Sequence, residues 1–250
     1  MHSTLFTIFG LPIRAYGLMM VVGFSLGLWR ATYVAKKRDI NTDRIYDLAL
    51  VVLLSGVIGS RLVYILLNLR TESFSRFFAV WEGGLSFHGG VFFAVLAAYI
   101  FTKRTKLSFL QYADLLAPSL AIAYAFTRIG CFLNGCCYGC PTSLPWGVRF
   151  LENGTLTPPS HPTQIYATIA NLLIFALLTQ LEKLRRANGF VFVSYLGLYG
   201  VYRFLVEFLR KGYSAQVWIL GLTQAQWVSI AMIVASLTII FTVYRRPSAK

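Results

Sequence analysis

Seven long apolar stretches, each near the length that crosses a lipid bilayer, constrain this sequence more than any other feature. A transmembrane helix needs about 20 mostly apolar residues, and short segments with charged or turn-forming residues separate the stretches. With 57% hydrophobic and only 13% charged residues, the chain lacks the composition of a water-soluble globule. We therefore predict an all-α polytopic membrane protein that forms a single integral-membrane domain over residues 1–250. Its seven expected spans are residues 16–35, 47–68, 85–101, 110–133, 165–181, 191–209 and 224–244.

The distribution of basic residues predicts which side of the membrane each loop faces. Thirteen of the 23 Lys and Arg residues fall in alternate loops and the C-terminal tail, and six fall in the remaining loops. Because cytoplasmic loops are enriched in Lys and Arg, we expect the N-terminus outside and the C-terminus in the cytoplasm. Membrane topology then accounts for the formal net charge of +14, and no nucleic-acid partner is needed to explain it. An outer loop at 134–164 carries a cysteine cluster and a His-Pro motif.

Four arginines fall inside the expected spans, where an ionised side chain costs about 2.5–3.5 kcal/mol on insertion scales. We expect Arg30 to reach the cytoplasmic surface with its long side chain. Arg61 has two open interpretations, a structural ion pair with Asp114 or Glu207, or a functional role. Arg128 and Arg203 lie in the outer halves of their helices, which predicts a functional role for both near the outer leaflet.

A phosphate-binding face is predicted on the span at 191–209. Tyr199, Arg203 and Glu207 are spaced four residues apart and so share one helical face, where the Glu207 carboxylate can orient the Arg203 guanidinium. Guanidinium groups bind phosphate through paired, charge-assisted hydrogen bonds. The obvious phosphate in a membrane is a lipid head group.

The segment from Glu82 to Gly90 combines four glycines with His88 just before a new apolar span. A helix N-terminus favours an anion, and the near-neutral pKa typical of histidine suits a general base or a donor. The alternative is a glycine-rich turn at a helix entry, in which His88 is merely interfacial.

Four cysteines lie within ten residues, at positions 131, 136, 137 and 140. The Cys137-x-x-Cys140 spacing is compatible with a redox pair, a disulfide or half of a metal site. Small buried thiols with one structural disulfide are a further interpretation, since the outer side of the membrane permits disulfides.

Several motifs, in order and over nearly the whole chain, resemble those of the bacterial prolipoprotein diacylglyceryl transferases. They are Tyr16-Gly17, Gly83-Gly84-Leu85-Ser86-Phe87-His88-Gly89-Gly90, Arg128-Ile129-Gly130, Asn134-Gly135, Tyr138-Gly139, His161-Pro162-Thr163-Gln164-Ile165-Tyr166 and the segment 199–208. The resemblance implies a multi-pass protein of the bacterial inner (cytoplasmic) membrane. It would transfer a diacylglyceryl group from phosphatidylglycerol to the lipobox cysteine thiol of a prolipoprotein at the outer face, releasing glycerol phosphate. Its partners would be phosphatidylglycerol, the prolipoprotein signal peptide with its lipobox, and membrane lipid, with no metal or other cofactor.

The same resemblance assigns roles to individual residues. His88, Arg128, Arg203 and Tyr16 would be catalytic: the arginines hold the head-group phosphate, and His88 helps to deprotonate the thiol or orients the reacting groups. The positions that would bind substrate are Asn134, Gly139, Tyr199, Glu207, Gly89, Gly90 and His161.

Three positions depart from the pattern of that family. Cys131 stands where Asn is common, Cys136 where Glu commonly follows Asn-Gly, and Ala167 where Glu commonly ends the His-Pro motif. If a missing carboxylate were the essential proton acceptor, the chain would be inactive or would use a changed mechanism. The retained histidine and arginine pair favours activity.

Two other functions remain open on the sequence. A membrane thiol oxidoreductase would use Cys136, Cys137 and Cys140, but it leaves the arginines without a role. A non-catalytic relative would bind phospholipid or lipoprotein precursor in the same groove without turnover, which suits the missing carboxylates.

Overall fold

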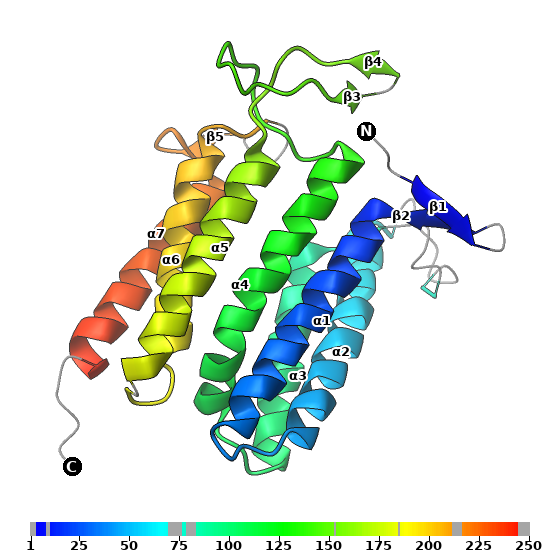
Figure 1. The fold of residues 1–250 in the computed structure, drawn as a ribbon. Helices are drawn as coiled ribbons and strands as arrows, with labels where there is room; N and C mark the ends of the chain where they lie inside the picture. The colour runs from blue at the N-terminus through cyan, green and yellow to red at the C-terminus, as the bar shows by residue number, and fades with distance from the viewer. Residues whose placement is uncertain are drawn as a thin grey trace. The chain divides into compact units, whose positions relative to one another are not determined.

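The computed structural model describes residues 4–8, 11–69, 77–78, 84–152, 154–184, 186–211 and 217–244 (Figure 1). Most of them are helical. The α-helices are α1 (Ala15–Lys36), α2 (Asp43–Leu67), α3 (Phe87–Arg104), α4 (Phe109–Asn134), α5 (Thr163–Leu181), α6 (Phe190–Glu207) and α7 (Gln224–Ile239). A 3-10 turn, η3 (Glu182–Leu184), extends α5, and a π-helical turn, η5 (Ile240–Tyr244), extends α7.

Three short antiparallel ribbons complete the described structure. They pair β1 (Thr4–Ile8) with β2 (Leu11–Arg14), β3 (Leu151–Glu152) with β4 (Thr155–Leu156), and β5 (Val217–Ile219) with β6 (Leu222–Thr223). Each ribbon has two strands, so the described strands form one hairpin before α1 and two between helices, and not a sheet that could act as a core.

Six of the described helices are long and apolar enough to cross a membrane: α1, α2, α4, α5 with η3, α6, and α7 with η5. The expected span at 85–101 corresponds to α3, an 18-residue helix that is not among these six and that ends in Lys103 and Arg104. The prediction of an all-α polytopic membrane protein is confirmed.

The chain divides into two compact units. Unit 1 comprises Met1–Arg30 and Ala113–Lys250, and unit 2 comprises Ala31–Tyr112. Within unit 1, α1, α5 and α7 run in one direction, and α4 and α6 run back (Figure 1). The start of α1, the end of α4, the start of α5 and the end of α6 therefore meet at one end of unit 1, which we call the loop end.

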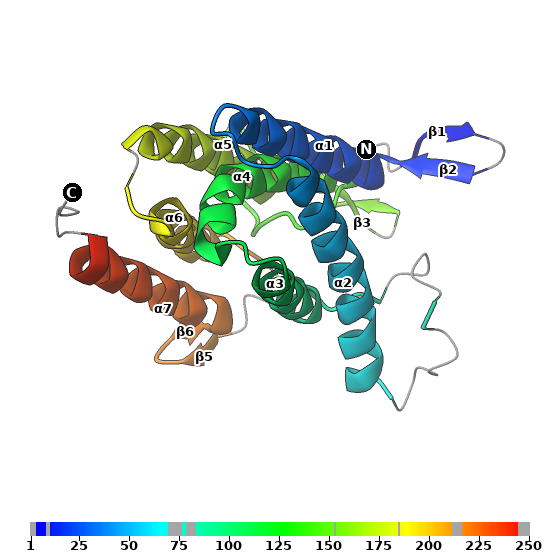
Figure 2. The same ribbon diagram turned by 90° about the horizontal axis from the view of Figure 1, so that it is seen from below.

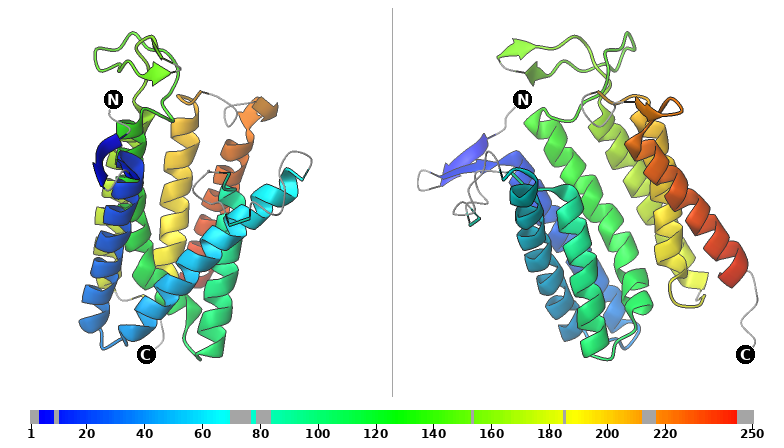
Figure 3. Two further views of the ribbon diagram at one scale, coloured as in Figure 1. Left: turned by 90° about the vertical axis from the view of Figure 1, so that its right-hand side faces the viewer. Right: turned by 180° about the vertical axis from the view of Figure 1, so that it is seen from behind.

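Close helix packing organises unit 1. An added Cβ at Gly23 of α1 would lie 2.8 Å from the Ala123 carbonyl oxygen of α4, and one at Gly27 would lie 3.0 Å from the Ser119 carbonyl oxygen. Small residues four apart let two helix backbones approach closely, which is how membrane helices gain packing energy. Figure 2 shows α1 beside α4, and Figure 3 shows α6 beside α7. The buried core lies between α4, α5, α6 and the end of α7, and includes Ala117, Ala121, Ile174, Leu178, Val191 and Tyr244.

Arg30 does not reach the membrane surface, and that expectation is wrong. Its side chain is buried, forms an ion pair with Glu182 of η3, and donates to the Leu115 carbonyl oxygen at 2.7 Å. The turn η3 extends α5 and brings the Glu182 carboxylate beside Arg30. An ion pair inside the protein, and not hydration at the membrane surface, therefore stabilises the Arg30 charge.

Two helix starts in unit 1 are capped by side chains. The Thr223 hydroxyl accepts from the Gln226 N–H, and the Gln226 side chain accepts from the Thr223 N–H, so these two residues form a capping box at the start of α7. The start of α6 has Gly189, which has no side chain to cap it. Asp114 of α4 instead accepts from the Gly189 N–H (2.6 Å) and the Phe192 N–H (2.7 Å).

Unit 2 is built on the packing of α2 against α3. Arg61 of α2 is buried, donates to the Gly84 carbonyl oxygen at 3.1 Å, and lies over the Tyr64 ring. Gly84 has a φ of +68°, and an added Cβ would lie 2.4 Å from Tyr64. These contacts favour a structural role for Arg61, which holds the entry to α3 against α2 through the Gly84 carbonyl oxygen and the Tyr64 ring.

Candidate active site

The end of α4 turns the chain back over its own last turn. Gly135, with a φ of +74°, follows Asn134, the last residue of the helix. Its N–H donates to the Phe132 carbonyl (3.0 Å), and the Cys136 N–H donates to the Cys131 carbonyl (3.1 Å). This pair of bonds is a Schellman motif, which brings the residue after the glycine against the last helical turn. Cys136 therefore returns to Cys131.

Gly139 joins three segments at the loop end. Its N–H donates to the His161 carbonyl (2.9 Å), and the next N–H, that of Cys140, donates to the Leu209 carbonyl (2.8 Å). An added Cβ at Gly139 would lie 2.2 Å from the Leu209 carbonyl oxygen and 2.8 Å from Thr163. Only glycine fits here, because the contact is with backbone that is itself hydrogen-bonded.

Arg128 lies in the last two turns of α4, against tyrosines. Its guanidinium contacts the Tyr124 hydroxyl and lies over the Tyr124 ring, 4.7 Å from the centroid. The Tyr124 ring in turn meets Tyr199 of α6 edge-on at 5.7 Å, and Tyr199 meets Tyr202 at 5.7 Å. The Arg128 Nε is buried and has no hydrogen-bond partner among the described residues. Arg128 thus retains an unused hydrogen-bond donor, and the Tyr124 ring connects it to Tyr199 on the predicted phosphate-binding face.

Glu207, at the end of α6, is the acidic centre of that face. It pairs with Arg203 as predicted, accepts from the Thr223 hydroxyl at 3.2 Å, and lies 4.0 Å from the Arg210 Nε. The Glu207 side chain is fully buried, whereas 16% of the Arg203 side chain is exposed. The buried Glu207 carboxylate therefore holds Arg203 in place, while part of the Arg203 side chain stays accessible.

The other predicted residues of unit 1 also lie at the loop end. Tyr16 is in the first turn of α1, where its backbone packs on Gly130 of α4 so closely that an added Cβ would be 3.1 Å from the Tyr16 Cα. Asn134 is exposed at the end of α4. His161 precedes α5, and its Nδ1 lies 3.3 Å from the Tyr166 hydroxyl. Eight of the eleven predicted residues therefore share one end of one unit.

The remaining three, His88, Gly89 and Gly90, belong to unit 2. His88 is exposed in the first turn of α3, beside Phe87. The Gly89 N–H donates to the Ser86 hydroxyl at 3.4 Å, and an added Cβ would lie 2.7 Å from the Gly59 carbonyl oxygen of α2. Both interpretations of this segment thus have support: the glycines serve helix packing, and His88 is free to meet a ligand at a helix start.

The cysteines gather differently from the Cys137-x-x-Cys140 pair that the spacing suggests. The sulfur atoms of Cys131, Cys136 and Cys137 all lie within 4.8 Å of one another. Cys140 instead donates to the Arg210 carbonyl at 3.2 Å, and all four cysteines are free thiols. Hydrogen bonds from Cys131 and Cys136, together with the charges of Arg128 and Arg210, lower the pKa of the Cys137 thiol. Gly135 was the sequence signal for this grouping, because a glycine after a helix marks the reversal.

One cluster of polar residues that stabilises the outer loop was not predicted from the sequence. The Tyr138 hydroxyl donates to Glu152 at 2.6 Å, Lys211 lies 3.6 Å from the same carboxylate, and the Tyr138 ring stacks on Phe150. The hydrogen bond from Tyr138 and the charge of Lys211 lower the pKa of the Glu152 carboxyl group. No spacing rule connects these residues, since Tyr138 and Glu152 lie 14 positions apart in the outer loop and Lys211 follows α6.

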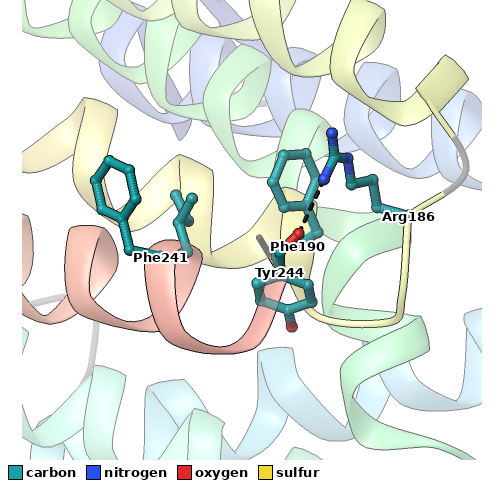
Figure 4. A pocket seen from close by; sticks show the side chains of 5 residues that line it. Arg186, Phe190, Phe241 and Tyr244 are labelled. Carbon is teal, nitrogen blue, oxygen red and sulfur yellow. Dashed lines mark hydrogen bonds between the residues drawn. The ribbon is translucent and has the colours of Figure 1, made fainter. Parts of the chain in front are cut away.

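A pocket lies at the opposite end of unit 1, between the start of α6 and the end of α7 (Figure 4). It is lined by Arg186, Phe190, Ile240, Phe241 and Tyr244, and Arg186 donates to the Tyr244 carbonyl at 2.9 Å. This pocket contains none of the predicted site residues, so we place the candidate active site at the loop end.

Comparison with known proteins agrees with the motifs at the loop end. Residues 3–242 match the family model described as prolipoprotein diacylglyceryl transferase. A phosphatidylglycerol–prolipoprotein diacylglyceryl transferase of Clostridium tetani is 36% identical over 90% of this chain and 91% of its own length. Proteins with the same name from Geobacter sulfurreducens (36% identity, 94% of this chain and 93% of theirs) and Clostridium botulinum strain Langeland (32% identity, 98% of both) are also similar. The chain belongs to the prolipoprotein diacylglyceryl transferase family.

Proposed function

We propose that this protein transfers a diacylglyceryl group from phosphatidylglycerol to the lipobox cysteine of a prolipoprotein. The observation that carries the proposal is the arginine arrangement at the loop end. Arg203 is held by the buried Glu207, and Arg128 lies against Tyr124, which contacts the same face of α6. The names of the similar proteins favour this function over a thiol oxidoreductase or a lipid-binding relative without turnover.

The two arginines would bind and stabilise the head-group phosphate. A guanidinium can donate two parallel hydrogen bonds to phosphate oxygens, and such bonds strengthen where water is scarce. Charge grows on the phosphate oxygen as the bond to the glyceryl carbon breaks, so donors fixed beforehand lower the barrier. Glu207 fixes Arg203 and Tyr124 fixes Arg128, which reduces the reorganisation needed during the reaction.

The acceptor thiol must become a thiolate before it attacks carbon. We assign help with deprotonation, or orientation of the reacting groups, to His88, which is exposed at the start of α3. Tyr16, Tyr199, Asn134 and His161 would orient the lipid and the peptide, and Gly139 would shape the backbone beside them in unit 1. Within unit 2, Gly89 and Gly90 would shape the backbone around His88.

The loop end would face the outer side of the inner membrane, with the N-terminus outside and the C-terminus in the cytoplasm. The distribution of basic residues supports this orientation. Phosphatidylglycerol would then arrive from the bilayer and the signal peptide from the export side.

The test is transfer by purified protein in detergent. Phosphatidylglycerol labelled in its diacylglyceryl group is incubated with a lipobox peptide that contains either Cys or Ser. We expect label on the Cys peptide only, with rates reduced at least about 100-fold in Arg203→Ala and His88→Ala. Arg44→Ala, an exposed arginine at the start of α2, is the matched control and should keep the rate. Equal transfer by wild type and Arg203→Ala would refute the assigned phosphate site.

A further inference from the structure

The three clustered thiols are presented by a fixed backbone and not by a loose loop. The Schellman turn sets Cys136 against Cys131, and Cys137 follows with a φ of +66°, which non-glycine residues rarely adopt. Two buried side chains at the start of α5 hold this turn. Gln164 donates to the Cys136 carbonyl (2.7 Å) and Thr163 to the Cys137 carbonyl (2.8 Å). A strained conformation persists only where its surroundings determine it in this way.

The spacing of the sulfur atoms suits one metal ion. Zinc–sulfur bonds of about 2.3 Å in a tetrahedron place sulfur atoms about 3.8 Å apart, and here the three sulfurs lie within 4.8 Å of one another. Small side-chain rotations would close the remaining distance. Cys140 is outside the cluster, so three thiols and not four are available. Three protein ligands with one open position is the pattern of zinc sites that act on a substrate.

The charge of the cluster and the exposure of one of its thiols also favour a metal site with a position open to a substrate. Three thiolates with one divalent cation carry a net charge of −1. Arg128 precedes Cys131 by three residues on α4, so a positive charge lies on the same helical face as the cluster. Cys131 is buried, whereas Cys137 is exposed, so an incoming group can approach from one side.

We propose that Cys131, Cys136 and Cys137 bind one thiophilic metal ion of the Zn²⁺ class, whose fourth position accepts the acceptor cysteine thiol. The second half of this inference rests on the proposed transferase function. The family resemblance implies no metal, so this site would be a property of the chain's own cysteines.

The chemistry balances without an oxidant or a reductant. On binding the metal the acceptor thiol releases its proton to water, because a coordinating thiol is deprotonated. Of the two roles assigned to His88, orientation of the reacting groups is then the one that remains. The thiolate sulfur then forms a bond to the glyceryl carbon that carries the phosphate ester. The carbon–oxygen bond breaks, and its electron pair leaves on the oxygen of glycerol phosphate. The product is a neutral thioether, which binds the metal less strongly than the thiolate and can leave.

The first test measures metal binding and needs no turnover. Purified, reduced protein is titrated with Zn²⁺ and analysed for bound metal, alongside Cys131→Ser, Cys136→Ser and Cys137→Ser. Cys140→Ser is the matched control. We expect one ion per chain in wild type and in the control, and at least about tenfold weaker binding in each of the other variants. Elution of each variant as a single detergent-solubilised species checks that it is folded.

The second test uses Co²⁺ as a spectroscopic probe. We expect thiolate-to-cobalt absorption in wild type, and a change in that spectrum when the Cys lipobox peptide is added but not when the Ser peptide is added. No bound metal, or equal binding by wild type and Cys136→Ser, would overturn the site. A cobalt spectrum that the Cys peptide leaves unchanged would overturn the fourth-ligand assignment. Transfer activity in metal-free protein would overturn the metal's role and leave the transferase proposal standing.

Discussion

Replacing Gly139 with alanine gives a sharp test of the architecture at the loop end. The new Cβ would lie 2.2 Å from the Leu209 carbonyl oxygen, 2.8 Å from the Thr163 methyl group and 3.0 Å from the His161 Cβ. The nearest atom belongs to the backbone, so no side-chain rotation relieves the clash. The Gly139 N–H bond to His161 or the Cys140 N–H bond to Leu209 must lengthen or break.

The magnitude follows from these two effects. Losing one or two backbone hydrogen bonds costs about 0.5–1.5 kcal/mol each, and overpacking a tight site costs about 1–3 kcal/mol. We therefore expect Gly139→Ala to lower the free energy of unfolding by about 2–5 kcal/mol. At about 2–4 °C per kcal/mol for a chain of this size, the Tm should fall by at least about 4 °C.

The assay is thermal unfolding in one detergent at one protein concentration. Gly17→Ala, a helical glycine with no atom within 4 Å of the added Cβ, is the control and should match or slightly exceed the wild-type Tm. A Gly139→Ala protein as stable as wild type would refute the claim that this glycine joins the three segments.

Three further predictions concern polar groups around the same end. Glu207→Gln removes the carboxylate that faces Arg203, and breaking a buried ion pair should cost about 3–5 kcal/mol in chemical unfolding; an unchanged midpoint would contradict the pairing. Thr223→Ala removes the cap of α7 and should cost about 0.5–2 kcal/mol in the same assay, whereas no loss would show the cap to be dispensable. The pKa of Glu152 is lowered in the folded state, so its stabilising effect is present above its unfolded pKa and is lost as the pH falls through its folded pKa. Wild type should therefore lose more Tm than Tyr138→Phe over that acidic range. Equal losses of Tm in the two proteins would contradict the link between the Tyr138 hydrogen bond and the lowered pKa of Glu152.

The helices were predictable because their signals are local. Apolar stretches of bilayer length mark the spans, and the Thr223 to Gln226 capping box marks one boundary with little dependence on the rest of the chain. The pairing of Arg203 with Glu207 was predictable for the same reason, since residues four apart on a helix are neighbours.

The remaining features depend on contacts between distant segments. Arg30 meets Glu182, 152 positions away, and Asp114 caps α6 by accepting from the N–H of Gly189, 75 positions away. No periodicity connects such partners. The prediction that Arg30 reaches water failed because a sequence pattern does not reveal a buried carboxylate supplied by another helix.

The cysteine cluster could be predicted only in part from the sequence. Spacing alone suggested Cys137 and Cys140 as partners, but backbone geometry after α4 decides otherwise. Gly135 permits the left-handed turn that returns the chain to Cys131, and the backbone bond from Cys140 to Leu209 carries the fourth cysteine away. A helix-end signal was therefore more informative here than the cysteine spacing.

The most direct test of the central claim is the stoichiometry of a single transfer reaction. Purified protein, phosphatidylglycerol and a Cys lipobox peptide are incubated, and the peptide adduct and the released head group are both quantified by mass spectrometry. We expect one glycerol phosphate released for each diacylglyceryl thioether formed on the cysteine, with both products absent for the Ser peptide and greatly reduced in Arg203→Ala. Folded protein that binds phosphatidylglycerol but forms neither product would refute the transferase function.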